Sequence, residues 1–165
     1  MSLNELNYKI SDSSKHVLKE LDNKLFGSDI ILILLSIGDI KGETILQKQV
    51  FLTWKEVYQN ETADLGYFPY RYGAYSRIIR DSCKILEKNN LVKVIKRKGE
   101  GSIFKITSDG MKVINEKILR LNLDLEKLKN NKENWDEWTR EGTLRYVYRN
   151  YPEYTTETRV KRLKW

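Results

Sequence analysis

One stretch of the chain, FPYRYGAYSRIIRDSCK at residues 68 to 84, joins an aromatic turn to cations at helical spacing. If a helix follows the turn, an advance of about 100° per residue places Arg77, Arg80 and Lys84 within one narrow arc. The opposite side of this helix is predicted to face the core and carries Tyr75, Ile78, Ile79, Ser82, Cys83, Ile85 and Leu86. Guanidinium and ammonium groups arranged in this way can bind phosphate oxygens, and arginine can also donate two hydrogen bonds to a guanine edge.

A β-hairpin is predicted directly after this helix, over residues 91 to 107. Its two β-rich segments are joined through KGEG, and Lys96, Arg97 and Lys98 lie at the expected tip. The segment carries five cations against one acid, so it can supply a second group of contacts to an anionic partner.

The chain as a whole is basic, with 30 Lys plus Arg against 23 Asp plus Glu and a net charge of +7 over 165 residues. This excess favours an anionic partner such as nucleic acid, although many basic proteins bind none. The cationic arc by itself is also typical of a solvated helix face, because Asp81 and Glu87 lie close to it. The basic hairpin that follows shifts the interpretation toward nucleic acid.

Two apolar helices and a loop are predicted ahead of the cationic helix. The run IILILLSI at 30 to 37 follows a possible N-cap pair, Ser28-Asp29, and its lack of alternation favours a buried helix. A second helix is expected at about 43 to 58, and residues 60 to 73 are expected to form a loop rich in glycine and tyrosine. The cationic helix then runs from about 74 to 90, where two asparagines suit a C-cap.

This order of elements is that of a winged helix-turn-helix, in an α+β but mostly α fold with additional N- and C-terminal helices. The segment IILILLSIGDIKGETILQKQVF, residues 30 to 51, resembles the start of PadR-like and MarR-like winged-helix regulators. The segment YRYGAYSRIIRDSCKILEKNNLVKV, residues 70 to 94, is similar to the tyrosine-glycine-x-tyrosine-serine entry to their recognition helix. The resemblance covers about residues 28 to 110 and implies a DNA-binding transcriptional regulator, and a cytoplasmic location is expected by default because neither a membrane span nor a signal segment is recognised. Its third helix would enter the major groove and its hairpin wing would contact the backbone or the minor groove.

Double-stranded DNA is therefore the expected partner. The residues expected to contact it lie at the helix entry, on the helix and on the wing: Arg71, Tyr72, Tyr75, Ser76, Arg77, Arg80, Lys84, Lys96, Arg97 and Lys98. A protein-interaction module, antitoxin-like or an adaptor, is the alternative. It would bind a protein partner through loop 60 to 73, with Tyr67, Phe68, Tyr70 and Tyr72 as its surface.

Apolar residues three and four apart continue after the wing and predict a helical heptad seam. Its members are Ile114, Ile118, Leu121, Leu125 and Leu128, preceded by Met111. We expect this seam to form a homodimer interface, as resemblance to PadR-like proteins also implies. The alternative is that it packs on the chain's own Trp135/Trp138 helix or on residues 13 to 26.

Three regions are expected: a helical N-terminal extension at 1 to 27, the DNA-binding domain at 28 to 110, and a C-terminal helical dimerisation and packing region at 111 to 165. The last helix should end at Pro152. The basic tail TRVKRLKW could contact phosphates or remain a solvated terminus.

Several classes of function and site are not expected. The single cysteine and single histidine allow neither an internal disulfide nor a common zinc site, and Cys83 is interpreted as a small core residue. No catalytic motif is present, so we expect no enzyme and no cofactor. The longest apolar run is too short to cross a membrane and no signal segment opens the chain, so no membrane association is expected.

Overall fold

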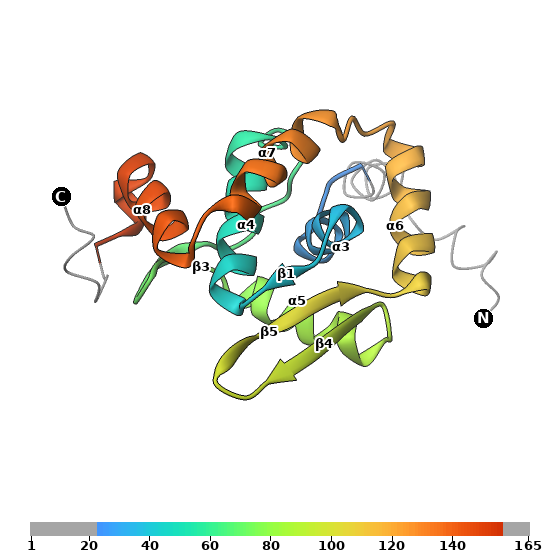
Figure 1. The fold of residues 1–165 in the computed structure, drawn as a ribbon. Helices are drawn as coiled ribbons and strands as arrows, with labels where there is room; N and C mark the ends of the chain where they lie inside the picture. The colour runs from blue at the N-terminus through green and yellow to red at the C-terminus, as the bar shows by residue number, and fades with distance from the viewer. Residues whose placement is uncertain (1–22, 157–165) are drawn as a thin grey trace, which may run out of the picture.

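The computed structural model describes residues 23 to 156, and these form an α+β fold that is mostly helical (Figure 1). The N-terminal residues 1 to 22 and the basic tail lie outside the described residues. The elements run in the order α3 (Gly27–Ile37), β1 (Ile40–Lys41), α4 (Glu43–Glu56), β2 (Phe68–Tyr70), β3 (Gly73–Tyr75), α5 (Arg77–Lys88), β4 (Val92–Arg97), β5 (Glu100–Ile106), α6 (Ser108–Leu121), α7 (Glu126–Glu137), α8 (Arg140–Asn150) and a 3-10 turn (Pro152–Tyr154).

Helix α3 lies at the centre, with α4, α6, α7 and the three-stranded sheet around it (Figure 1). Residues 30 to 35 are all buried, which explains why this run shows no polar face. The helix begins at Gly27, earlier than the predicted Ser28-Asp29 cap, and Asp29 accepts a hydrogen bond from the Phe26 backbone N–H at 2.7 Å. It ends before Gly38, as predicted. A Cβ on Gly27 would lie 2.7 Å from Ile79 Cδ1, so a larger residue at the start of α3 would displace the Ile79 side chain of α5.

The three-stranded sheet is antiparallel in the order β1-β5-β4. Strand β1 precedes α4 and pairs Ile40 with Phe104, while β4 and β5 form the hairpin predicted from the sequence. Gly99 in the connecting turn has φ of 73°, a conformation that glycine adopts without strain. The pairing of β5 with β1 therefore attaches the β4–β5 hairpin to the segment between α3 and α4.

A second hairpin, β2–β3, lies inside the segment predicted as a loop. Phe68 pairs with Tyr75 and Tyr70 pairs with Gly73, and the rings of Phe68, Tyr70 and Tyr75 contact one another at centroid distances of 5.0 to 5.9 Å. The loop prediction is wrong here because cross-strand aromatic contacts stabilise the strand pairing. Gly66 and Pro69 are typical of loops and do not predict a hairpin.

Helix α5 begins at Arg77, three residues later than predicted, because Gly73–Tyr75 pair as β3. Ser76 is its N-cap and accepts a hydrogen bond from the Ile79 N–H at 3.1 Å. Asn89 is the C-cap and Asn90 adopts φ of 60°, so the predicted end is confirmed.

The region after the wing contains two helices where one continuous seam was predicted. Thr107 caps α6, but α6 ends at Leu121 and Asn122 is left-handed, with φ of 49°. Helix α7 begins at Glu126, after Leu125. The left-handed residue turns the chain, so the heptad pattern cannot continue along one helix axis.

Helix α8 and the 3-10 turn pack on α4 through aromatic contacts. Tyr151 and Tyr154 meet the edge of Phe51 at centroid distances of 5.0 and 4.9 Å. The hydroxyls of Tyr146 and Tyr151 both donate to Glu56 Oε1, at 2.7 and 3.0 Å. Tyr146, Tyr151 and Tyr154 therefore attach the C-terminal helix to the core.

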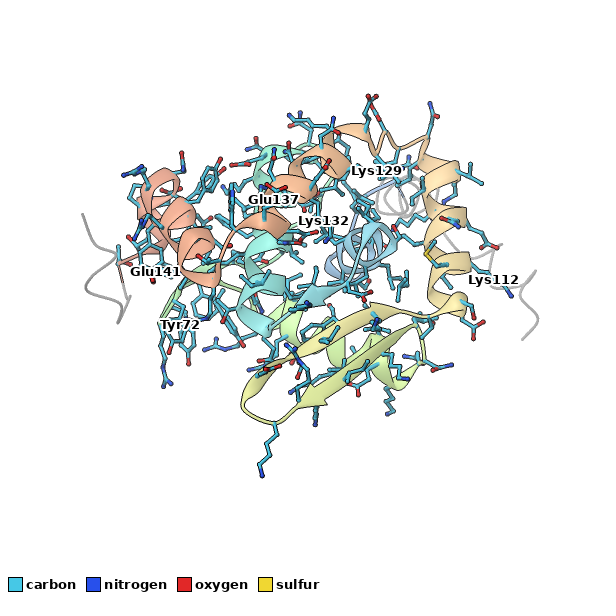
Figure 2. All side chains as sticks on the ribbon, viewed as in Figure 1. Tyr72, Lys112, Lys129, Lys132, Glu137 and Glu141 are labelled. Atoms are coloured by element: carbon cyan, nitrogen blue, oxygen red, sulfur yellow. The ribbon has the colours of Figure 1, made fainter. Side chains whose placement is uncertain are left out.

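An ion pair between the buried Lys132 and the exposed Asp136 joins α7 to this core. Lys132 is fully buried and lies between α7 and the central helices (Figure 2), where Nζ donates to Asp136 Oδ2 at 2.7 Å. The other oxygen of Asp136 accepts from Gln49 Nε2 on α4 at 2.8 Å. The pair thus connects α7 to α4, since a lone buried ammonium would be costly.

Candidate nucleic-acid interface

Helix α5 exposes half of its circumference. Ile79, Cys83 and Leu86 are buried, and the exposed residues are Arg77, Ile78, Arg80, Asp81, Lys84, Ile85, Glu87 and Lys88. The expected core positions of Ile78 and Ile85 are wrong, because 48% of Ile78 and 60% of Ile85 are exposed. The reason is that the buried residues of α5 occupy only about 60° of its circumference, so the flanks remain outside.

A hollow of about 470 Å³ lies between α4, the β2–β3 hairpin, α5 and the β4–β5 hairpin. Six of the residues expected to bind DNA line it: Arg71, Tyr72, Tyr75, Arg80, Lys84 and Lys96. They come from three segments that are separate in the sequence, and the fold brings them together. Two carboxylates, Glu43 and Glu87, also line the hollow, so its cationic surface is interrupted by negative charge.

Arginines of this region lie over aromatic rings. The Arg77 guanidinium is 4.8 Å from the Phe68 ring centroid, and that of Arg71 is 5.5 Å from the Tyr70 centroid. Arg140 of α8 lies 4.9 Å from the ring of Tyr72. A guanidinium above a ring keeps its N–H donors in its own plane, so stacking orients these groups without using their donors.

Arg80 is also oriented, but by a neighbouring acid. Its Nε donates to Asp81 Oδ1 at 3.1 Å, and both side chains are exposed. This bond uses one of the five guanidinium donors, and an exposed pair of this kind contributes little to stability. The terminal nitrogens of Arg80 are not part of this bond.

The expected DNA contact of Ser76 is wrong. Ser76 is fully buried, and its Oγ donates to the Leu65 carbonyl at 2.5 Å while accepting from Ile79 N. Gln47 of α4 holds the Ser76 backbone on both sides, at 2.8 and 3.0 Å. Ser76 therefore positions the start of α5 and offers no atom to a ligand.

Lys48 is a buried cation that sequence inspection does not identify. Only 2% of it is exposed, and Nζ donates to the Ala74 carbonyl at 2.6 Å. Burial, together with a smaller contribution from the nearby Arg140 charge, lowers the pKa of Lys48 to about 7. In the sequence, Lys48 sits between two other polar residues, Gln47 and Gln49, and nothing in this polar run indicates that the lysine is buried.

Two hydrogen bonds hold the Arg97 side chain at the wing tip. Arg97 Nε donates to the Gly101 carbonyl at 2.8 Å, and Arg97 Nη1 pairs with Glu100 Oε2 at 2.9 Å. Lys98 and Lys96 are exposed. Arg97 thus braces the turn, while the two lysines present charge to solvent.

Cys83 lies at the wall of the hollow as a small buried residue, as predicted. Burial raises the pKa of its thiol to about 11, with smaller contributions from the charges of Glu87 and Glu43. The thiol is therefore protonated at neutral pH and is a poor nucleophile.

The seam residues expected at a dimer interface contact the chain's own core. Ile114 and Leu128 are buried, and the partly buried Ile118, Leu121 and Leu125 pack against the same cluster. The alternative that the seam packs within the chain is thus the one observed. The underlying reason is that α6 and α7 both cover the apolar α3 and α4.

The tyrosine-rich loop that could have bound a protein partner is largely used in folding. Tyr67 donates its hydroxyl to the Gln47 carbonyl at 2.7 Å and stacks on Trp54 at 6.0 Å, and burial raises its pKa. Of the four aromatic residues Tyr67, Phe68, Tyr70 and Tyr72, only Tyr72 is exposed. It lies at the outer side of the molecule, beside α8 (Figure 2).

Over residues 23 to 156, no group of three or more His, Cys, Asp or Glu side chains is placed to hold a metal ion. In that same part of the chain, no helix combines the length and apolar character needed to cross a membrane. Comparisons with protein-family models, with curated proteins and with solved structures find no match to this chain.

Proposed function

We propose that this chain is a winged helix-turn-helix DNA-binding protein that acts as a transcriptional regulator. The order α3, β1, α4, α5, β4, β5, with the β2–β3 hairpin inserted between α4 and α5, supports this proposal. The sheet order β1-β5-β4 supports it too, since the strand before α4 pairs with the second strand of the wing. In this arrangement α5 is the recognition helix and β4–β5 is the wing.

The observation that carries the proposal is the convergence of cations from three segments around one hollow. Arg71 comes from the β2–β3 turn, Arg80 and Lys84 come from α5, and Lys96 comes from the wing. A major groove about 12 Å wide admits one helix, and phosphates then line both sides of that helix. Cations flanking the exposed half of α5 match this distribution of charge.

Each part of the interface has a different role in the proposal. Arg77 and Lys84, on the outer surface of α5, face base edges and phosphates, and Phe68 orients Arg77. Lys96 and Lys98 contact phosphates through the wing, because exposed lysines are point charges without a fixed donor geometry. Arg71 and Tyr72 contact the backbone beside the N-terminus of α5.

A duplex-binding experiment tests this function. Duplexes are selected from a random pool, and affinities of wild type, Lys98→Ala and Arg77→Ala are measured by fluorescence anisotropy across a salt series on the selected and a random duplex. Lys98→Ala should weaken both and lower the salt slope by about one unit. Arg77→Ala should cost about 1 to 3 kcal/mol on the selected duplex and little on the random one if it contacts a base.

Lys129→Ala is the matched control. Lys129 is exposed on α7, which lies on the opposite side of the molecule from the wing (Figures 1 and 2). Its loss removes the same charge as that of Lys98, so it should leave affinity and salt slope nearly unchanged. Equal effects of Lys98→Ala and Lys129→Ala would reduce the interaction to non-specific charge and reject the proposed interface.

A homodimer remains a prediction. Two copies of α5 would then read half-sites about 34 Å apart on one face of the duplex. The surface that would join the copies is not the Ile114–Leu128 seam, since that seam is occupied within the chain. Light scattering of the free protein and of its duplex complex tests the stoichiometry.

A further inference from the structure

Two exposed isoleucines, Ile78 and Ile85, lie two turns apart on one flank of α5. Ile78 and Ile85 are seven residues apart, which places them within about 20° of each other and ~10 Å apart along the helix axis. On the same wheel the cations Arg77, Lys84 and Lys88 occupy the outermost position, and Arg80 lies on the opposite flank, at the hollow. The exposed half of α5 therefore has a cationic centre and an apolar edge.

The position of Ile78 is fixed by its surroundings. A Cβ on Gly66 would lie 2.9 Å from Ile78 Cδ1, and one on Gly27 would lie 3.8 Å from Ile78 Cγ2. Gly66 also has φ of 65°. The loop before β2 thus contacts one side of Ile78, while 48% of the residue is exposed.

Ile78 and Ile85 are exposed on a helix that otherwise separates its apolar and charged residues. A partner surface that covered them would gain apolar burial. Burying one such side chain contributes about 1.5 to 3 kcal/mol, and neither residue obtains this fully in the free chain. The covering surface must also carry negative charge, because three cations border the apolar edge on the same helix. The major groove meets both requirements: phosphates line it, and the thymine C5-methyl is its apolar group.

We propose that Ile78 and Ile85 contact thymine methyl groups and so determine part of the sequence preference. This inference rests on the proposed DNA-binding function. The thymine methyl projects from the outer edge of the base toward its own strand, so a side chain on the flank of a groove-bound helix meets it more readily than one at the centre. A ~10 Å separation corresponds to about three base-pair steps, so the preferred site should contain two thymines on one strand at about that spacing.

A double-mutant cycle between protein and DNA tests this inference. Each thymine of a selected duplex is replaced in turn by deoxyuridine, which removes only the methyl group. Wild type should lose about fourfold in affinity at each of two positions, since about one buried methyl is removed. Ile85→Ala should bind the thymine duplex more weakly but lose nothing further on the uracil substitution at one position, and Ile78→Ala should behave likewise at the other.

Val113→Ala is the matched protein control, because Val113 is an exposed aliphatic residue on α6, 47% accessible. It should keep the full sensitivity of wild type to both uracil substitutions. Because Ile78 contacts the loop, its variant is checked by thermal unfolding, and the more exposed Ile85 carries the test if Ile78→Ala is unstable. Independent, multiplicative effects of Ile85→Ala and uracil would overturn the inference while leaving DNA binding intact, whereas failure of wild type to bind any duplex would overturn both.

Discussion

Gln47 holds Ser76 by two hydrogen bonds: Nε2 donates to the Ser76 carbonyl at 2.8 Å, and Oε1 accepts from the Ser76 N–H at 3.0 Å. Both residues are buried. The Gln47 amide therefore supplies hydrogen-bond partners to the backbone of Ser76, the last residue before α5, as a neighbouring strand would. Gln47 thereby sets the position of α5 relative to α4.

Replacing Gln47 by alanine should lower the free energy of unfolding by about 1 to 3 kcal/mol, because the buried Ser76 N–H loses its partner while the Ser76 carbonyl keeps only the Arg80 N–H. Duplex affinity should fall with it, since α5 would no longer start from a fixed point. Urea denaturation followed by circular dichroism measures the first effect. Gln59→Ala, at an exposed position, is the control and should change stability by less than about 0.5 kcal/mol. Similar stability of the two variants would contradict the assigned role.

Lys48 should make stability depend on pH. Its pKa is lowered from 10.5 to about 7 in the folded chain, so between these values the unfolded chain binds a proton that the folded chain has released. Folding stability contributed by the neutral amine is therefore present above about pH 10.5 and is lost as the pH falls toward 7. Relative to Lys48→Met, wild type should gain up to about 1.4 kcal/mol per pH unit within this window.

The comparison is made by urea denaturation of both proteins at pH 6, 8 and 9. The Ala74 carbonyl loses its donor in Lys48→Met, but this adds a constant difference that does not vary with pH. A stability difference that stays flat across pH 6, 8 and 9 would show that Lys48 keeps its proton in the folded chain.

The tyrosines on Glu56 should make the fold sensitive to alkali. Burial and then the hydrogen bond to Glu56 raise the pKa of Tyr146 from 10.0 to about 12, and the same causes raise that of Tyr151 further. Because the neutral phenol is the form that the fold favours, its stabilisation is complete below pH 10 and is lost as the pH rises to 12 and above.

The check is a series of urea midpoints from pH 9 to 12 for wild type and for the double variant Tyr146→Phe/Tyr151→Phe. Wild type should keep its full advantage over the variant at pH 9 and lose it as the pH rises to 12. An advantage that persists unchanged at pH 12 would mean that these phenols stay neutral for another reason.

Ile114 distinguishes a core residue from an interface residue. Ile114→Ala should destabilise the chain by about 2 to 4 kcal/mol, because it leaves a cavity beneath α6, and should not alter the molar mass measured by light scattering. Leu119→Ala on the same helix is the control, since Leu119 is 80% exposed. A stable Ile114→Ala protein of half the wild-type mass would restore the seam as a subunit interface.

Several elements could be predicted from the sequence because their causes are local. The KGEG turn fixes the hairpin, Thr107 caps α6, and Asn89-Asn90 end α5, and each depends on the backbone preferences of a few neighbouring residues. The apolar run at 30 to 37 identified the central helix for a similar reason, since only a helix buried all round lacks a polar face. The positions of the cations on α5 also follow from helical periodicity alone.

Only the tertiary structure decided which side chains are buried between neighbouring elements. The sequence pattern of α5 could not tell that its contact with α3 is narrow enough to expose Ile78 and Ile85, or that Gln47 would bury Ser76. The same holds for Lys48, whose burial depends on Ala74 and Arg140, residues distant in the chain. Periodicity gives the direction of a side chain around its own helix. Burial is set by the neighbouring elements, and these are fixed only when the whole chain packs around α3.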